Sequence, residues 1–303
     1  MKTPISWVGN KSSILNYLYA SFPADYDRYI EPFGGSAAVL LGKPHRDKME
    51  VINDYSRDIV NLYRCMRDRP IAFIHEMGFL NFTSRDDFRL MKEFLDKTIF
   101  EDDFLEEELK LTEIMFPPAE AAELAQLYQA NHADYDLKRA VTFLRVQRTS
   151  FSSTGKSFGG RKINLQYVFK LIQDFHQRMQ GVIIENQDFE KLIKHYDRKE
   201  AFFYCDPPYY ETEDFYNGFN RNDHLRLRRV LDNTKGKWLV SYNDCEEIRY
   251  LYRNYNIMSF DRVHQMAQQY EKGKRFGELL IANYDFDEQI RARPQQSLFS
   301  WEQ

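Results

Sequence analysis

The sequence lacks the features that mark secreted, membrane-spanning and metal-binding proteins. Its 303 residues include only three cysteines, and Cys65, Cys205 and Cys245 are too far apart to indicate a zinc site or a disulfide framework. No stretch approaches the roughly 20 apolar residues that span a bilayer, and residues 1–10 lack the apolar segment of a signal peptide. These absences predict a soluble, cytoplasmic protein with reduced, packed thiols and no metal site.

Acidic residues are missing from residues 137–162, although the net charge of the whole chain is −4. Seven basic residues fall in this region: Lys138, Arg139, Arg145, Arg148, Lys156, Arg161 and Lys162. Residues 101–113 are strongly acidic and offset that charge. The asymmetry predicts one face directed at a polyanion, with two solvated helix faces as the alternative.

Strand and helix patterns alternate at both ends of the chain and enclose a mainly helical middle. The strand-like runs are residues 29–32, 49–53, 181–184, 201–205, 237–241, 256–260 and 279–282. Their alternation with helical patterns predicts an α/β fold with a Rossmann-like, mostly parallel sheet. We expect residues 1–64 and 176–289 to form this domain, residues 65–175 to form an inserted, mainly helical lobe, and residues 290–303 to form a flexible tail.

Polar residues follow the first two predicted strands, at the sheet edge where open parallel sheets bind ligands. The segment Glu31-Pro32-Phe33-Gly34-Gly35-Ser36 carries two glycines, which let the backbone approach a ligand before a helix begins. Asp54 lies nineteen residues after Gly35, about the spacing of a carboxylate that binds ribose hydroxyls. The pattern is not GxGxxG, which disfavours a dinucleotide. A tight turn and a helix cap are the alternatives.

The tetrad Asp206-Pro207-Pro208-Tyr209 is the most informative motif. It follows residues 201–205, an apolar run typical of a central strand buried on both faces. The prolines stiffen the loop and leave its carbonyl groups as acceptors. A carboxylate and a free carbonyl side by side suit an amine donor. The alternative is a proline-rich turn in which Asp206 acts as a cap.

The adenine amino group is such a donor, and it is a poor nucleophile because its lone pair is delocalised into the ring. If the Asp206 carboxylate and the Pro207 carbonyl each accept one N–H, the nitrogen moves towards tetrahedral geometry and exposes its lone pair to an electrophilic methyl group. Tyr209 offers an aromatic face on which a flipped base can stack. The tetrad therefore predicts methyl transfer to an amino group.

With these residues the chain resembles the DNA adenine methyltransferase (Dam) family of class α amino-methyltransferases. Trp7 to Lys11 is similar to the first cofactor motif of the family, and Glu31 to Ser36 to its methionine-binding loop. Asn53-Asp54 is similar to the ribose-binding turn, and Ile184 to Phe189 to the motif beside the cofactor's adenine. Glu278 to Tyr284 resembles the closing strand. The order of these motifs, with a long insertion before the tetrad, is the class α arrangement.

The resemblance implies transfer from S-adenosylmethionine to adenine N6 in duplex DNA. It implies the following cofactor-binding residues: Trp7, Lys11, Glu31, Pro32, Phe33, Gly35, Asp54, Asp188, Phe189 and Asp206. The catalytic candidates are Asp206, Pro207, Pro208 and Tyr209. Methylation of RNA adenine or of cytosine N4 keeps the same fold and is one alternative, and a catalytically inactive DNA-binding regulator is another.

The insertion is then expected to recognise the target, with its basic end nearest the DNA. The DNA-binding candidates are Arg145, Arg148, Ser150, Ser153, Lys156 and Arg161. Family members that read GATC carry an Asn-Gly step after the arginine, whereas this chain has Thr149-Ser150-Phe151 there. This departure leaves the target sequence open, GATC included. A flexible linker with scattered phosphate contacts is the alternative for this stretch.

The sequence also suggests partners other than double-stranded DNA. The tail segment Gln295-Gln296-Ser297-Leu298-Phe299 resembles the short peptide that binds the bacterial DNA sliding clamp, and an inert tail is the alternative. A restriction nuclease that shares the target site is a further candidate partner. We therefore expect the protein to be associated with the DNA of a bacterium or phage.

Overall fold

The computed structural model describes residues 1–5, 7, 9–78, 84–96, 105–131, 135–151, 155–212, 218–263 and 275–292. These residues form two compact units. The helical unit comprises Met1–Asn10, Gly35–Gly42 and Ser56–Gln180, and the sheet unit comprises Lys11–Gly34, Lys43–Tyr55 and the chain from Gly181 onward. The domain boundaries expected after residues 64 and 175 remain a prediction, because each unit consists of three separate segments of the chain.

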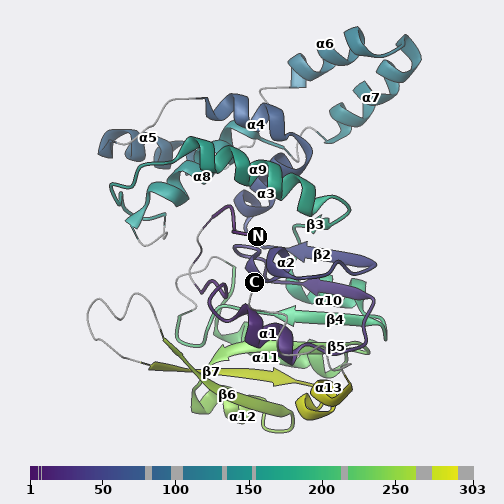
Figure 1. Ribbon diagram of the computed structural model, residues 1–303, viewed down its shortest axis with the longest axis vertical. Helices are drawn as coiled ribbons and strands as arrows, with labels where there is room; N and C mark the ends of the chain where they lie inside the picture. Colours follow the sequence, from purple (N-terminus) through teal and green to yellow (C-terminus); the bar gives the residue numbers. More distant parts are fainter. Residues whose placement is uncertain are drawn as a thin grey trace, which may run out of the picture. The chain divides into compact units, whose positions relative to one another are not determined.

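The sheet unit contains a seven-stranded sheet in the order β3-β2-β1-β4-β5-β7-β6 within the described residues (Figure 1). Its strands are β1 (Arg28–Glu31), β2 (Met49–Asn53), β3 (Ile183–Glu185), β4 (Ala201–Cys205), β5 (Lys237–Asn243), β6 (Asn256–Val263) and β7 (Arg275–Ala282). The first five strands in this order pair in parallel, and β7 pairs antiparallel with both β5 and β6. The expected mostly parallel sheet is confirmed.

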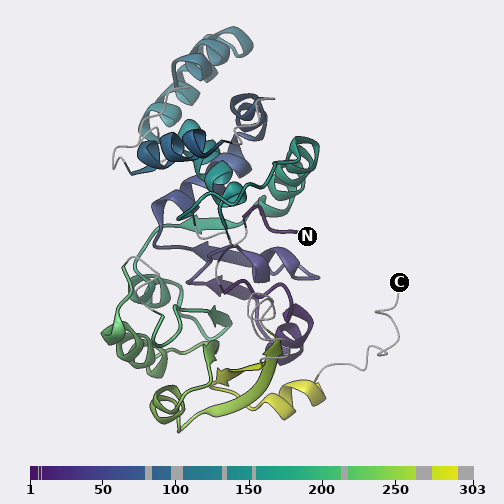
Figure 2. The ribbon, with the colours of Figure 1, turned by 90° about the vertical axis from the view of Figure 1, so that its left-hand side faces the viewer.

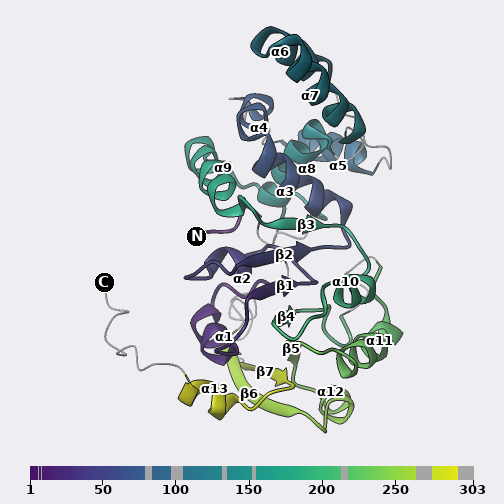
Figure 3. The same cartoon turned by 90° about the vertical axis from the view of Figure 1, so that its right-hand side faces the viewer.

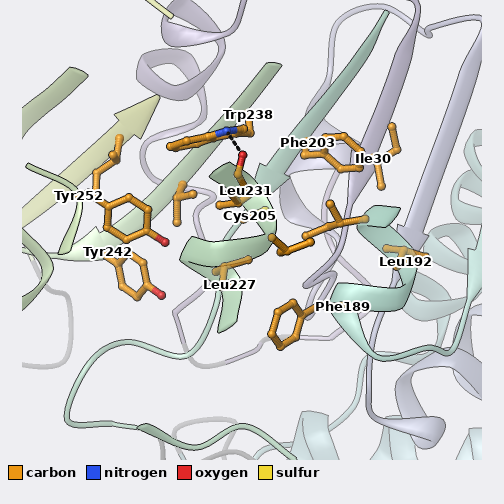
Figure 4. Close-up of a cluster of buried hydrophobic side chains, with 14 of the residues drawn as sticks. Ile30, Phe189, Leu192, Phe203, Cys205, Leu227, Leu231, Trp238, Tyr242 and Tyr252 are labelled. Atoms are coloured by element: carbon orange, nitrogen blue, oxygen red, sulfur yellow. Dashed lines mark hydrogen bonds between the residues drawn. The ribbon is translucent and has the colours of Figure 1, made fainter. Parts of the chain in front are cut away.

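The central strand β4 is buried on both faces, as its five apolar residues predict. Successive side chains of a strand point to opposite faces. Phe203 and Cys205 belong to the core under α10 (Phe189–Tyr196) and α11 (Arg221–Asp232), where the Trp238 indole N–H donates to the Leu231 carbonyl over 3.1 Å (Figure 4). This core fixes the position of the carboxyl end of β4 in the sheet.

The opposite face of β4 packs on aromatic residues around α1 (Leu15–Ser21). Phe202 meets the Phe22 ring with 4.7 Å between the ring centroids. The Tyr284 hydroxyl donates to the Ser21 carbonyl over 2.9 Å and joins α1 to the segment before α13 (Phe286–Ala292). Figure 3 shows α1 and the α10–α11 pair on opposite sides of the sheet. A short helix, α12 (Glu246–Leu251), follows β5.

The helical unit packs around α8 (Leu137–Thr149), whose residues are mostly buried. Figure 2 shows the blue and teal helices of this unit from a second side. Arg139 on α8 donates to the Asp58 carboxylate over 3.1 Å and to the Leu95 carbonyl over 2.7 Å. Several helices begin at a recognisable signal, such as the capping box of Ser84 and Asp87. The helices are α2 (Ala38–Gly42), α3 (Arg57–Asp68), α4 (Pro70–Met77), α5 (Arg85–Leu95), α6 (Leu105–Met115), α7 (Pro118–Asn131), α8 (Leu137–Thr149) and α9 (Leu165–Met179).

The helix that follows the glycine segment begins at Ala38. Ala37 has a φ of 58°, a left-handed conformation that cannot be part of a right-handed helix. In the described part of the chain, no helix has both the length and the apolar character needed to cross a lipid bilayer.

Candidate active site

The carboxyl ends of the parallel strands carry the residues that the motifs identified. Pro32 follows β1, Asp54 follows β2 and Asp206 follows β4, all within the sheet unit. The sheet order reverses its direction between β1 and β4. Open α/β sheets bind ligands at such reversal points, beyond the carboxyl ends of the strands. The fold therefore brings these three segments to one ligand-binding edge.

Asp206 is held by two donors from distant parts of the sequence. The Lys11 ammonium nitrogen lies 2.6 Å from each carboxylate oxygen, and the Ser241 hydroxyl donates to Oδ1 over 2.8 Å. The Lys11 side chain is 1% exposed and that of Asp206 is 20% exposed. Hydrogen bonds between ionised partners are the strong ones, and these three fix the orientation of the carboxylate.

The environment of Asp206 acts on its pKa in both directions. Burial raises the pKa of this carboxyl above its usual value, and the carboxylate of Glu278 adds to the rise. Lys11 and Ser241 oppose the rise because they donate hydrogen bonds to the ionised form. Burial prevails, so the pKa is raised. Lys11 is thus the main group that favours the ionised form.

Tyr209 is fixed through both its hydroxyl and its ring. The hydroxyl donates to Glu278 Oε2 over 3.2 Å, and the Lys11 nitrogen lies 4.9 Å from the ring centroid. The Tyr209 carbonyl accepts from the Thr212 N–H and hydroxyl at 2.9 and 2.8 Å, which turns the loop. Pro207 is buried, and no donor from the described residues reaches its carbonyl oxygen. An acceptor thus remains next to the Asp206 carboxylate.

The loop after β1 is joined to β2 by a close backbone contact at Gly34. Its N–H donates to the Asn53 carbonyl over 2.7 Å, and a Cβ on Gly34 would lie 2.7 Å from the Ile52 side chain. Only glycine fits this approach. Glu31 at the end of β1 is buried and accepts a hydrogen bond of 3.0 Å from the Tyr29 hydroxyl. Pro32 is buried, and its carbonyl accepts from the Asn53 side chain over 2.9 Å.

The turns after β2 and β3 are joined through amide side chains. Asn53 is buried, and its side chain exchanges two hydrogen bonds with the Gln187 backbone, of 3.0 and 2.8 Å. The Asn186 side chain donates to the Asp54 carbonyl over 2.8 Å. These bonds place Asp54 beside the segment that leads to Asp188.

Asp188 caps α10 and pairs with an arginine of α11. Its Oδ1 accepts from the Glu190 N–H at 3.0 Å, and Arg226 Nη2 lies 2.6 and 2.7 Å from its two oxygens. The Arg226 guanidinium also lies 4.5 Å from the centroid of the Phe189 ring. Phe189 is buried and meets Phe33 with 5.4 Å between the ring centroids. The structure thus places Phe33 next to the Asp188-Phe189 segment.

Two cofactor candidates, Trp7 and Gly35, lie together in the helical unit. Gly35 has a φ of 47°, and a Cβ at this position would come within 3.1 Å of the Trp7 ring. Both the backbone conformation and the contact favour glycine. The Tyr63 hydroxyl donates to the Gly35 carbonyl and holds the turn.

Two arginines of the predicted DNA face are partly withdrawn from solvent. Arg145 donates to the Met77 carbonyl, and burial lowers the pKa of its guanidinium. Burial also lowers the pKa of Arg148, whose guanidinium lies 5.6 Å from the centroid of the Tyr167 ring. Their role in DNA binding remains a prediction.

Of the remaining DNA-binding candidates, Ser150, Lys156 and Arg161 lie in the segment between α8 and α9. Ser150 is buried, and its hydroxyl donates to the Gln147 carbonyl over 3.2 Å and accepts from the Gly155 N–H over 3.1 Å. Lys156 and Arg161 are exposed. Ser153 lies outside the described residues. Lys156 and Arg161 are therefore better placed than Ser150 to meet a polyanion.

Three residues at the candidate site were missed by sequence reasoning: Ser241, Glu278 and Arg226. A polar residue within a buried strand was the available signal for Ser241 and Glu278, because such groups need a hydrogen-bonding partner. Arg226 is one of four arginines on α11, and nothing in the sequence distinguishes it from the others.

Comparison with known proteins gives a consistent result over nearly the whole chain. A family model described as D12 class N6 adenine-specific DNA methyltransferase matches residues 7–266. The chain is 25% identical over 293 residues to a type II methyltransferase, M1.LlaDCHI, of Lactococcus lactis subsp. cremoris, a match that covers 92% of this chain and 94% of that protein.

Two further relatives show similar levels of identity. The type II methyltransferase M.CviBI of Paramecium bursaria Chlorella virus NC1A is 24% identical over 269 residues, with 88% of this chain and 92% of that protein covered. The retron Ec67 DNA adenine methylase of Escherichia coli is 25% identical over 268 residues, with 84% of this chain and 82% of that protein covered. The similarity thus extends well beyond the short motifs.

Proposed function

The chain belongs to the D12 class of N6 adenine-specific DNA methyltransferases, and we propose that it transfers the methyl group of S-adenosylmethionine directly to an adenine flipped out of duplex DNA. The carboxylate of Asp206 is the observation that carries this proposal. It lies at the end of a buried strand and is held by Lys11 and Ser241. The neighbouring Pro207 carbonyl accepts no hydrogen bond from the described residues and can therefore accept one from a substrate. An amino group needs two such acceptors to become nucleophilic.

The residues of the sheet unit fit S-adenosylmethionine in chemical type. Glu31 offers a buried carboxylate for the ammonium group of the methionine moiety, and Asp54 offers a half-buried carboxylate for ribose hydroxyls. The Asp188-Phe189 pair offers an acceptor and an aromatic ring for adenine. When bound, the cofactor would supply an electrophilic methyl group on a sulfonium sulfur, and the sulfur would keep the electron pair of the broken C–S bond as a neutral thioether. Pro32 and Phe33 line the same loop. Trp7 and Gly35 remain candidates through the family resemblance.

Asp206 and Pro207 act on the adenine amino group. The carboxylate and the carbonyl each accept one N–H, which exposes the nitrogen lone pair and holds it in position. After the new N–C bond forms, the nitrogen carries a surplus proton, and the Asp206 carboxylate takes it up. A carboxyl with a raised pKa is suited to this step because it is a stronger base than an ordinary aspartate. Pro208 stiffens the loop, and the Tyr209 ring stacks on the flipped base.

Incubation with labelled S-adenosylmethionine tests this function. The substrates are unmethylated genomic DNA, a duplex without adenine, and RNA, and the products are separated as nucleosides. We expect label only in N6-methyladenine from DNA. Label in N4-methylcytosine or in RNA favours the alternative acceptors, and DNA binding without any label favours an inactive regulator. The Asp244→Asn variant is a matched control for Asp206→Asn, because the carboxylate of Asp244 follows β5 and pairs with Arg249.

The exposed basic residues after α8 define the proposed DNA face. We expect Lys156→Ala to weaken duplex binding uniformly across sequences and to reduce the salt slope by about 1. Lys110→Ala on the acidic helix α6 is the control and leaves binding unchanged, since its side chain is 73% exposed among glutamates. Fluorescence anisotropy at several salt concentrations measures both. Equal salt slopes of duplex binding for the two variants would show that the DNA face lies elsewhere on the protein.

Two partner proposals rest on the sequence and on the relatives that it matches. The segment Gln295–Phe299 lies outside the described residues, and we propose that it docks on the DNA sliding clamp. Saturable binding of a peptide spanning residues 293–303 to the clamp of the host supports this, and no binding refutes it. A cognate restriction nuclease is proposed because two relatives are named type II methyltransferases. Mapping of methylated adenines in cells would give the site that such a nuclease must share.

A further inference from the structure

A buried hydroxyl group links the sheet core to Asp206. Ser241 is fully buried on β5, and its Oγ lies 2.8 Å from Asp206 Oδ1. The parallel pairing of Cys205 with Val240 places Asp206 and Ser241 at the next position along the two strands. Because an ionised carboxylate only accepts hydrogen bonds, the Ser241 hydroxyl must be the donor. The alternative acceptor, the Cys205 carbonyl, is 3.5 Å away.

A second buried hydroxyl group lies behind Ser241. The Tyr204 hydroxyl on β4 is 3.1 Å from Ser241 Oγ, and its side chain is fully buried. Burial and the nearby Asp206 carboxylate raise the pKa of Tyr204 well above its usual value, so the phenol keeps its proton. Ser241 has one proton and gives it to Asp206, so the Tyr204 hydroxyl donates to Ser241. The bonds therefore run in one direction, from Tyr204 to Ser241 to Asp206.

We propose that Tyr204 and Ser241 are positioning residues, which orient the Asp206 carboxylate towards the adenine amino group through this directed chain of hydrogen bonds. The inference rests on the proposed function and specifies how its central group is held. With the Ser241 bond on Oδ1 and the Lys11 ammonium shared by both oxygens, the carboxylate cannot rotate freely. Its remaining lone pairs have fixed directions, which is what transition-state positioning requires.

Hydroxyl chains are cooperative, so the outer member strengthens the inner bond. Tyr204 polarises the Ser241 hydroxyl and makes it a better donor to the carboxylate. Without Tyr204, Ser241 is free to turn towards the Cys205 carbonyl. Tyr204 thus acts on Asp206 only through Ser241, and this dependence distinguishes the chain from two separate packing roles.

Other groups also influence Asp206 and must stay constant in the test. Lys11 before α1 and Glu278 on β7 act on its pKa, and Glu31 at the end of β1 and Cys205 on β4 belong to the same buried cluster. Substituting Ser241 changes none of these side chains. A shift in the titration of Asp206 on that substitution therefore reports the hydroxyl group itself.

The test compares Ser241→Ala and Tyr204→Phe in single-turnover methyl transfer to duplex DNA over a range of pH. We expect Ser241→Ala to lower the rate constant about tenfold and to move the acid limb to higher pH, because a hydrogen bond to the ionised carboxylate is lost. Tyr204→Phe has a smaller effect in the same direction. In the Ser241→Ala background it has no further effect, since the chain is already broken.

Two controls separate positioning from packing. Ser241→Thr keeps the hydroxyl group and should retain the wild-type acid limb. Tyr242→Phe removes a buried hydroxyl from the next residue of β5, where it contacts His224 at 2.8 Å, and should leave the acid limb in place. The proposal is overturned if Ser241→Ala and Tyr204→Phe fold but keep the wild-type acid limb. If Ser241→Ala does not fold, Tyr204→Phe decides alone, since it removes a single oxygen atom.

An infrared titration without DNA or cofactor separates this inference from the proposed function. The band of the protonated Asp206 carboxyl is identified by its absence in Asp206→Asn. We expect this band to appear at higher pH in Ser241→Ala than in the wild type, and an unchanged band would overturn the hydroxyl chain. A wild-type protein that transfers no methyl group to adenine would instead overturn the proposed function, whatever the infrared result.

Discussion

Two carboxylates in the sheet unit have nearly the same ion-pair geometry in different surroundings. Lys11 lies 2.6 Å from each oxygen of Asp206, and Arg226 lies 2.6 and 2.7 Å from the oxygens of Asp188. The side chains of the first pair are 1% and 20% exposed, and those of the second 35% and 39%. The two pairs therefore differ in their contact with water and not in their distances.

This difference in exposure sets what each pair contributes. An exposed ion pair contributes only about 0–1 kcal/mol, because water and salt screen it. Removing one member of a buried pair leaves an uncompensated charge and costs about 3–5 kcal/mol. Burying the charges of Asp206 and Lys11 thus costs folding free energy, which is typical of a catalytic site. The pair of Asp188 and Arg226 costs little and serves to hold a turn. Variants on both sides can test this contrast.

Asp206→Ala is expected to have the largest effect. It removes an acceptor that acts on the reacting nitrogen, so single-turnover transfer should fall at least roughly a thousandfold while the protein still folds. Asp188→Ala should instead weaken binding of S-adenosylhomocysteine and leave measurable transfer at saturating cofactor. Rapid-quench kinetics and calorimetry measure the two effects. Comparable losses of transfer at saturating cofactor would abolish the contrast.

Lys11→Met is expected to have the next largest effect and to depend on pH. Without the ammonium group, the pKa of the buried Asp206 carboxyl rises further above its unfolded value. The folded state then binds a proton that the unfolded state lacks, so stability falls as pH rises through the folded pKa. We expect a loss of about 3–5 kcal/mol at neutral pH and a smaller loss in acid. Denaturant unfolding of Lys11→Met and Lys11→Arg over this range measures it, and a pH-independent loss would contradict it.

Arg226→Met should have a smaller effect on stability, of about 1 kcal/mol, that shrinks in high salt. Arg226 also contacts Glu190 and the buried Asp223, and the Asn220 N–H still donates to Asp223 when Arg226 is removed. We expect the Asp188 turn to loosen and the affinity for S-adenosylhomocysteine to fall about tenfold. Arg229→Met, an exposed change on the same helix, is the control. If the loss of stability did not depend on salt, the Asp188–Arg226 pair would behave like the buried Asp206–Lys11 pair.

The contrast also marks what the sequence could predict. β4 has the bounds that its five apolar residues predict, and Asp206 lies at its end, because burial of a central strand is a local pattern. Lys11 was identified as a cofactor candidate, but its pairing with Asp206 was missed, since the two residues are 195 positions apart and meet only through the folded sheet. Asp188 was identified from the family motif, but its pairing with Arg226 depends on how α11 packs beside α10.

Lys194→Met is expected to have the smallest effect and completes the series. Lys194 contacts Glu190 and belongs with it to an exposed network that Arg226 and Asp188 complete. Lys194 and Arg226 together lower the pKa of the Glu190 carboxyl. A lowered folded pKa gives stability that is present at neutral pH and is lost as pH falls through that pKa. We therefore expect Lys194→Met to cost about 0.3 kcal/mol at neutral pH and nothing in acid.

Denaturant unfolding of Lys194→Met, Glu190→Gln and the double variant at both pH values measures this coupling. Cofactor affinity should stay at the wild-type level, because Arg226 still holds Asp188 through both oxygens. A loss above about 1 kcal/mol, or weaker cofactor binding, would mean that the exposed network acts as one coupled unit. In that case the difference in exposure alone would not explain why Asp206 and Asp188 contribute differently.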